Sequence, residues 1–440
     1  MNETQKNMMS VLYDHLDSMF IGKDSPNMLL QMLPISISIN PNDFANAISP
    51  TNMSEGALAT AENFAAIVGD VPDVQVKFVS KGKIEDVYKW ILNNAVSIED
   101  MKEASPNKEK YEAAKKVLYV DGGFIPTDAY KAYKDACSDY DNAIFERESE
   151  RIISDLSTPK GQQMWSLKRK KLDTAVNTAY DNLKNFDNIK NALNIMQTAF
   201  ASGVTELLAE EKKFFKTSEQ TSDTGKSWHI CNAYPSDWYS NDSMYTKIVI
   251  NQNTKQDVNT SKYFKLNADM NLKVGLFSSG DVDTTHTSES SHSQQEENVT
   301  EMEMEVAAVK IERPWLNETL LSLKGWKIEG EAKGHISDGS PLDSANKNKG
   351  VMPLIPKYMI IVRNVTLKGD FSDKLCDISN QKTEIGTNVG IGPFRLKGHT
   401  EFGNHSEEVK SDVSKNSITI TTPQILGYIS SVVPFSPNHE

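Results

Sequence analysis

Four histidines in the second half of the chain have the residue type and the spacing that a metal site or a pH switch requires. They form two pairs, His286 with His292 and His399 with His405, and the interval within each pair is the same. Neutral imidazole is a ligand for divalent transition metals, and two pairs brought together could bind one such ion. The same four rings would repel each other below about pH 6, where imidazole becomes charged. A third interpretation is that exposed turns accept any polar residue.

The histidine pairs belong to two stretches, 272–306 and 388–420, that share an order of features. Each stretch begins with Val-Gly and a nearby Phe, continues through His-Thr and His-Ser, and ends in alternating apolar and polar residues. This order predicts an internal repeat of two long β-hairpins, each apolar on one face at its base and polar toward its tip. Directly opposite side chains of such a hairpin lie about 5 Å apart, so the histidines of one pair could share an ion.

The predicted hairpin tips are the candidate interaction residues. Gly-Asn at the second tip favours the positive backbone angles of a tight turn. The tip residues are Thr287, Ser288 and Glu289 in the first hairpin and Glu401, Phe402, Gly403 and Asn404 in the second.

Helical spacing of apolar residues dominates the first half of the chain. It occurs in the first twenty residues, over 83–95, and almost throughout 126–215. The sequence Thr-Pro-Lys-Gly at 158–161 interrupts the last stretch, which predicts two long antiparallel helices. A further break near 185–187 would give three shorter helices instead. Alternating residues predict a strand over 33–39, and a weaker one over 74–79.

Alternation of β-branched and aromatic residues with polar ones dominates the second half. The candidate strands are 245–250, 263–278, 301–311, 326–331, 359–367, 386–396 and 417–421. The predicted fold class is α+β, with a helical N-terminal half of long antiparallel helices followed by an antiparallel β-sandwich-like domain that carries the two duplicated polar hairpins. The predicted divisions are a mixed α/β region over 1–125, a long-helix hairpin or bundle over 126–216, a polar linker over 217–226 and the β domain over 227–440.

Composition restricts the function. The chain has 440 residues and a formal net charge of -13, which argues against binding to nucleic acid through a basic surface. We find no signal-like start and no apolar run long enough for a membrane helix. Three widely spaced cysteines without a CxxC motif are typical of a reducing compartment. These features predict a cytoplasmic protein, with release by a non-classical route left open.

Aromatic residues gather at the start of the β half, and they have two interpretations. Stacking faces beside an aspartate can bind sugars, but such clusters more commonly pack into a core. The cluster consists of Trp228, Tyr234, Trp238, Tyr239 and Tyr245. Gly-Lys-Ser at 225–227 lacks the upstream glycine of a phosphate-binding loop, and the other common catalytic signatures are absent from the sequence.

The resulting hypothesis is a non-enzymatic binding or self-assembly protein that presents two polar hairpins on a helical spacer. Its partner would be a second copy of the chain or another protein, not nucleic acid. No cofactor is expected beyond the divalent transition metal that the histidines could bind. One alternative is a pore-forming or membrane-acting toxin-like protein, the only interpretation that involves a membrane. A second alternative is a carbohydrate-acting or carbohydrate-binding protein.

Overall fold

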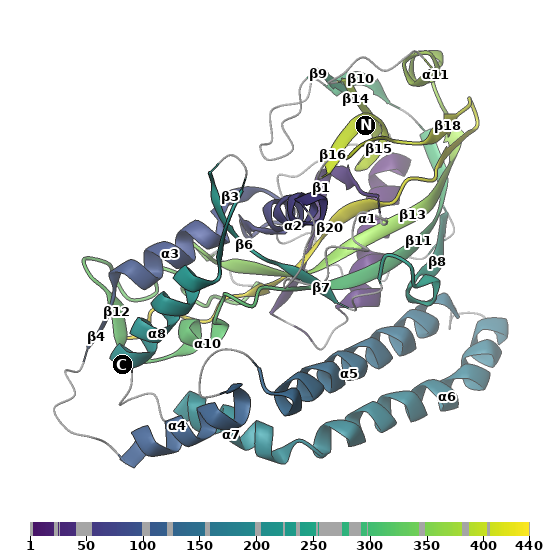
Figure 1. The fold of residues 1–440 in the computed structure, drawn as a ribbon. Coiled ribbons are helices and arrows are strands. Elements are labelled where there is room, and N and C mark those ends of the chain that lie inside the picture. Colours follow the sequence, from purple (N-terminus) through teal and green to yellow (C-terminus); the bar gives the residue numbers. More distant parts are fainter. Residues whose placement is uncertain are drawn as a thin grey trace.

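A computed structural model gives the fold of most of the chain (Figure 1). The described residues are 3–21, 25, 27–40, 55–98, 106–120, 126–154, 159–198, 204–222, 225–234, 238–251, 254, 275–280, 292–296, 298–342, 348–380, 387–402 and 405–439.

The centre of the fold is an antiparallel sheet that joins both ends of the chain. Strand β1 pairs with β20, β20 with β13, and β13 with β11. Strands β7 and β8 both pair with β11, while β19 pairs with β13 and with β18. The bounds are β1 (Met28–Ser38), β7 (Asn232–Tyr234), β8 (Thr246–Asn251), β11 (Asn298–Glu312), β13 (Leu354–Asp370), β18 (Ser411–Val413), β19 (Ser417–Ile420) and β20 (Gln424–Val432).

Sequence alternation explains β11. Met302 and Met304 are buried, whereas the glutamates between them project from the other face. Glu301, Glu303 and Glu305 each meet a cation on a neighbouring strand, directly opposite for Glu301 and Glu305 and on the diagonal for Glu303. The ion pairs are Lys368–Glu301 at 2.6 Å, Lys247–Glu303 at 2.5 Å and Arg363–Glu305 at 2.7 Å.

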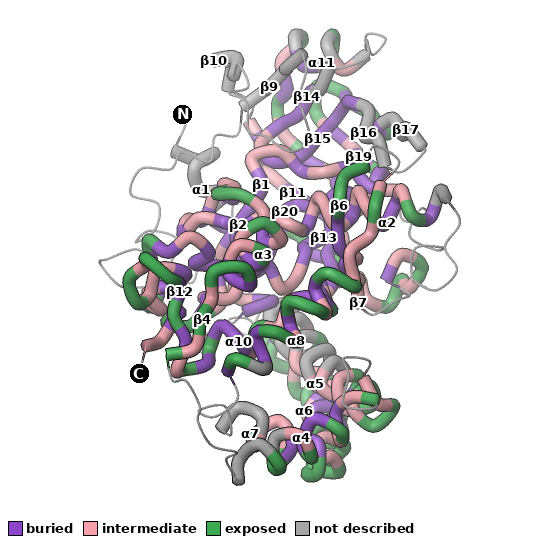
Figure 2. Tube along the Cα trace, turned by 60° about the vertical axis from the view of Figure 1, so that its left-hand side comes forward, coloured by how far each residue is buried: buried purple, intermediate pink, exposed green. Residues whose placement is uncertain are grey.

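Hydrophobic cores lie against both faces of this sheet, and buried residues follow its strands in Figure 2. Ile360 and Val362 of β13 belong to the core that contains helix α1 (Glu3–Phe20). Met359 and Ile361 belong to the opposite core. That second core includes residues of α2 (Glu55–Val68), α3 (Ile84–Asn94), α8 (Val204–Thr217) and α10 (Glu318–Ser322). Coverage of both faces explains why β13 is apolar at successive positions.

Apart from α11, the remaining helices form a layer beside the sheet (Figure 1). Helix α5 (Asp128–Ile153) is preceded by Thr127, whose hydroxyl accepts a hydrogen bond from the Tyr130 amide at 3.2 Å. It packs against α6 (Pro159–Lys184). A turn at residues 185 and 186 separates α6 from α7 (Asp187–Thr198), which agrees with the break offered near 185–187, but α8 follows as a fourth helix and the three-helix alternative does not hold. Helix α7 packs against α4 (Pro106–Leu118), while α11 (Asp373–Asn380) lies after β13.

Smaller sheets complete the described fold. One has the order β10-β9-β14-β15, and each of the others is a pair: β12 with β4, β16 with β17, β2 with β3, and β5 with β6. The bounds are β2 (Asp70–Pro72), β3 (Ser80–Lys83), β4 (Ala95–Ser97), β5 (Glu219–Thr221), β6 (Ser227–His229), β9 (Gly275–Gly280), β10 (His292–Glu296), β12 (Trp326–Ile328), β14 (Thr387–Ile391), β15 (Phe394–Lys397), β16 (His399–Phe402) and β17 (His405–Glu408).

The fold is therefore a mixture of helices and antiparallel sheet, in agreement with the predicted α+β class. The predicted divisions do not separate the cores, because β1 from the first 125 residues pairs with β20 near the C-terminus. The predicted linker over 217–226 instead contains β5, which forms a hairpin with β6. Residues 74–79 form no named strand, although Lys77 makes an isolated bridge with Met32. Within the described residues, no helix combines the length and the apolar character needed to cross a membrane.

Candidate functional site

The first predicted hairpin is described only at its base. Its tip residues Thr287, Ser288 and Glu289 lie outside the described residues, and so does His286. Strand β10 begins at His292, which is paired with Phe277 of β9. The metal hypothesis for the first histidine pair therefore stays a prediction.

Within the second stretch, β16 pairs antiparallel with β17, and the predicted turn residues Gly403 and Asn404 between them lie outside the described part of the chain. His399 is paired with Glu408, and His405 with Phe402. The two histidines are therefore not cross-strand partners, contrary to the expectation that they would face each other. Among the described residues, we find no group of three or more His, Cys, Asp or Glu residues placed to bind a metal.

The first strands of the two similar stretches pair with each other, and their last strands lie on the two sides of β13. Strand β9 of the first stretch pairs antiparallel with β14 of the second, with Ser278 opposite Val389. In the main sheet, Met302 of β11 and Ile418 of β19 are both paired with Leu367, from opposite sides of β13. The corresponding strands of the two stretches therefore lie next to each other or next to the same strand. The second stretch also turns early, between β14 and β15, a turn that the repeat did not predict.

A buried polar cluster is the most unusual chemical environment among the described residues. It lies where α3, α8 and the start of α10 meet. Glu211 of α8 has only 3% of its surface exposed. Its Oε1 accepts a hydrogen bond of 2.8 Å from Asn317 Nδ2, and its Oε2 accepts a long one of 3.4 Å from the Tyr88 hydroxyl. Burial raises the pKa of Glu211 to about 7, against the lowering effect of these two donors and of Lys115.

A histidine of β6 contacts α8 at Phe215, one helical turn after Glu211. The side chain of His229 is fully buried, and its Nε2 lies 2.7 Å from the Phe215 carbonyl. A carbonyl can only accept, so this nitrogen carries the hydrogen. Nδ1 then lies 2.9 Å from Glu85 Oε1. This contact is a hydrogen bond only if a proton lies between the two atoms, on either the imidazole or the carboxyl. His229 thus connects β6, α8 and α3.

Aromatic rings enclose the histidine. The Phe215 ring stacks on His229 with centroids 4.0 Å apart, and Trp315 lies 5.3 Å from the same imidazole. Tyr88 meets Phe215 edge-on at 5.6 Å. The cluster is therefore shielded from solvent by rings contributed by three separate parts of the chain. Because the imidazole is fully buried, a dissolved substrate has no direct route to it.

The predicted aromatic cluster at the start of the β half is mainly core. Trp228 and Trp238 are buried, with 7% and 1% of their surfaces exposed, and Trp238 belongs to the core that contains α3 and α8. Tyr245 lies under the Arg363 guanidinium at 3.8 Å. These burials favour the packing interpretation over sugar stacking, which needs an accessible ring face.

A second buried polar network ties the small sheet to the main one. Gln424 of β20 is fully buried, and its Nε2 donates a 2.7 Å hydrogen bond to the Arg395 carbonyl of β15. The Arg395 amide donates to Gln424 Oε1 at 3.1 Å, and the Ser36 hydroxyl of β1 donates to the same oxygen. The Arg395 Nε donates to the Ser36 carbonyl at 3.1 Å, while burial lowers the pKa of this guanidinium to about 10.

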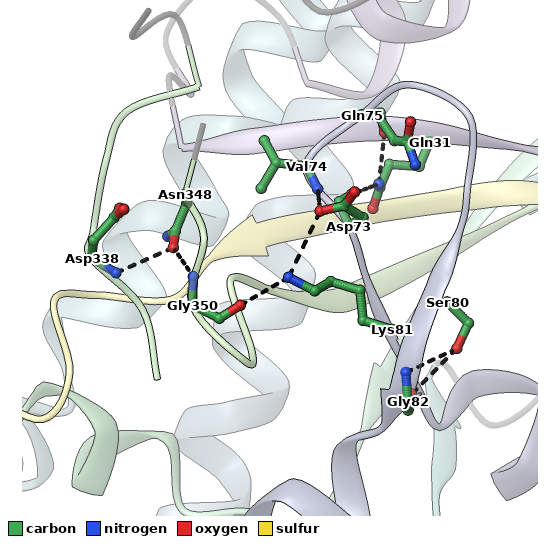
Figure 3. A network of polar contacts seen from close by, with 10 residues as sticks. All are labelled: Gln31, Asp73, Val74, Gln75, Ser80, Lys81, Gly82, Asp338, Asn348 and Gly350. Atoms are coloured by element: carbon green, nitrogen blue, oxygen red, sulfur yellow. Dashed lines mark hydrogen bonds and ion pairs between the residues drawn. The ribbon is translucent and has the colours of Figure 1, made fainter. Parts of the chain in front are cut away.

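A third network lies among loops and is shown in Figure 3. Lys81 Nζ donates to the Gly350 carbonyl at 3.0 Å and lies 3.9 Å from the Asp73 carboxylate. Gln31 Nε2 of β1 donates to the carbonyls of Asp73 and Gln75, at 2.8 Å each. The network fastens the β2–β3 hairpin to β1 and to the loop before β13, so its role is structural.

The buried cluster was missed from the sequence because its members are remote along the chain. One signal could have found it. Glu211 lies on the apolar stripe of α8 together with Leu207, Leu208 and Phe215, where a carboxylate is unexpected. We compared the chain with known proteins, and no family model, curated protein sequence or solved structure matches it.

Proposed function

We propose that the chain is a non-enzymatic binding or self-assembly protein. In this proposal, two duplicated polar hairpins project from a sandwich-like β region, and the helical layer acts as a spacer. The observation that supports the proposal most strongly is that the two stretches are attached to the sheets by corresponding strands. Their first strands, β9 and β14, pair with each other, and their last strands, β11 and β19, flank β13. Two arms rooted in this way present their far ends to a partner together.

The buried cluster supports a binding role more than a catalytic one. The side chains of Glu211 and His229 are both buried. Their partners are side chains and backbone groups of neighbouring elements, which is typical of groups that hold elements in place.

Light scattering coupled to size-exclusion chromatography tests the proposal. We expect the mass of the wild-type chain to rise with concentration as copies associate through the second hairpin. Phe402→Ser changes the predicted tip and should keep the chain at monomer mass. Leu167→Ser is the matched control, since Leu167 is 76% exposed on α6 and lies away from the hairpins.

The outcomes separate the interpretations. A monomer at every concentration would remove self-assembly. Loss of association in Leu167→Ser, but not in Phe402→Ser, would move the interface to the helical layer. Dye release from liposomes by the wild-type chain would instead favour the pore-forming alternative, whereas binding to immobilised oligosaccharide would favour the carbohydrate one.

A further inference from the structure

Helix α8 lies between the helical layer and the core that covers the sheet, and it contacts both. On one side, its Glu210 forms an ion pair with Lys115 of α4. On the other side, its residues Leu207, Leu208 and Phe215 belong to the core that covers the sheet. Any change in the docking of α8 therefore acts on both parts of the molecule.

Glu211 lies at the centre of this docking surface. The groups that face it are Tyr88 of α3, Asn317 before α10, Lys115 of α4, Tyr119 just after α4, and Glu210 of α8 itself. Both of its hydrogen-bond partners, Tyr88 and Asn317, are neutral. Lys115 attracts it electrostatically, but this ammonium is already paired with Glu210, and Glu210 repels it.

An ionised carboxylate in such a place lacks hydration and has no cation among its hydrogen-bond partners. A protonated carboxyl fits better, because a neutral group costs far less to bury. We propose that a proton on Glu211 fastens helix α8 to α3 and α10, so that the docking of α8 tightens when Glu211 is protonated and loosens when it ionises.

The sign and size of the effect follow from proton linkage. The pKa of Glu211 is about 7 with α8 docked, above its ordinary value of 4.5, which applies once the helix opens to solvent. A raised docked-state pKa means that docking is strongest at low pH and weakens as the pH rises toward 7. With these two values, the equilibrium constant for opening α8 increases about tenfold between about pH 6 and about pH 8.

Hydrogen exchange followed by mass spectrometry tests this on the full chain. Exchange at α8 is compared at the two pH values after correction for the intrinsic rates, with β13 as an internal reference for global unfolding. For the wild type, we expect protection of α8 to fall about tenfold at the higher pH while β13 stays protected. Glu211→Gln keeps the size of the side chain and removes its titration, so protection of α8 should no longer depend on pH.

Two further variants make the test specific. Tyr88→Phe removes one donor to the carboxylate, so the proton should be held more tightly and the loss of protection should shift to higher pH. Glu109→Gln makes the same charge change at an exposed position of α4 and should respond like the wild type. Equal protection of wild-type α8 at both pH values would overturn the proposal. A pH response that survives in Glu211→Gln would also overturn it. If Glu211→Gln does not fold, the shift of the pH response in Tyr88→Phe still tests the proposal.

Discussion

Replacement of Gln424 by leucine tests how the small sheet is joined to the main one. Leucine has nearly the same size as glutamine, so the core stays filled while the amide is removed. The Gln424 amide makes hydrogen bonds to the Ser36 hydroxyl and to the amide and carbonyl of Arg395. After the substitution, the Arg395 amide still has the Ser36 hydroxyl oxygen at 3.2 Å, but the buried carbonyl loses its glutamine donor.

The expected cost follows from these bonds. Each of the three neutral hydrogen bonds contributes about 1 kcal/mol net, and the buried carbonyl left without its donor adds about 1 kcal/mol, the lower end of the usual cost. The added apolar surface of leucine recovers about 1 kcal/mol. We therefore expect Gln424→Leu to lower the free energy of unfolding by about 3 kcal/mol.

Urea unfolding followed by circular dichroism measures this difference. Gln163→Leu makes the same change at an exposed position of α6, and its effect should stay within about 0.5 kcal/mol. In a double-mutant cycle, Ser36→Ala should cost less in the Gln424→Leu background than in the wild type, because the two side chains share a hydrogen bond.

A loss of less than about 1 kcal/mol in Gln424→Leu would refute the reasoning, since it would mean that the amide bonds contribute little beyond volume. Strict additivity with Ser36→Ala would contradict the shared bond.

Three further predictions concern other parts of the fold. Gly427→Ala would place a Cβ atom 2.2 Å from the Gln31 carbonyl oxygen, so we expect β1 and β20 to be forced apart at a cost of about 3 kcal/mol, measured by urea unfolding. Burial raises the pKa of the Cys231 thiol to about 11, so maleimide at pH near 7.5 should label it only after denaturation, whereas labelling in the native protein as fast as at Cys137 would contradict its burial. The raised pKa of Glu211, about 7, means that its contribution to stability is fully present below 4.5 and lost as the pH rises through about 7. Unfolding free energies of Glu211→Gln should therefore exceed those of the wild type by about 3 kcal/mol near pH 8 and show a flatter pH profile.

Local pattern predicted many elements because neighbouring residues determine it. The apolar stripe of the first twenty residues corresponds to α1, whose Met8, Leu12, Leu16 and Met19 are buried. The alternation of Met302, Met304 and Val306 corresponds to β11. Strand β20 was missed, because its residues are apolar at successive positions and lack the alternation that marks a half-buried strand.

The candidate site was less accessible to sequence reasoning. The histidine pairs stood out by spacing alone, but the pairing of β16 with β17 sets His399 opposite Glu408. A shift of a few residues in register changes every cross-strand neighbour, and turn geometry determines that register. His229, Glu85 and Glu211 come from three separate segments, so no local window contains their relation.

The sequence by itself determined where helical and extended periodicities lie, because burial of one face imposes its period on consecutive residues. It also determined the acidic charge and the similarity of the two stretches. Only the tertiary structure decided that β1 joins β20, that α8 contacts both the helical layer and the core over the sheet, and that Glu211 is enclosed. These features depend on contacts between residues that lie far apart in the sequence, and such contacts form because packing of the whole chain excludes water from both faces of the sheet.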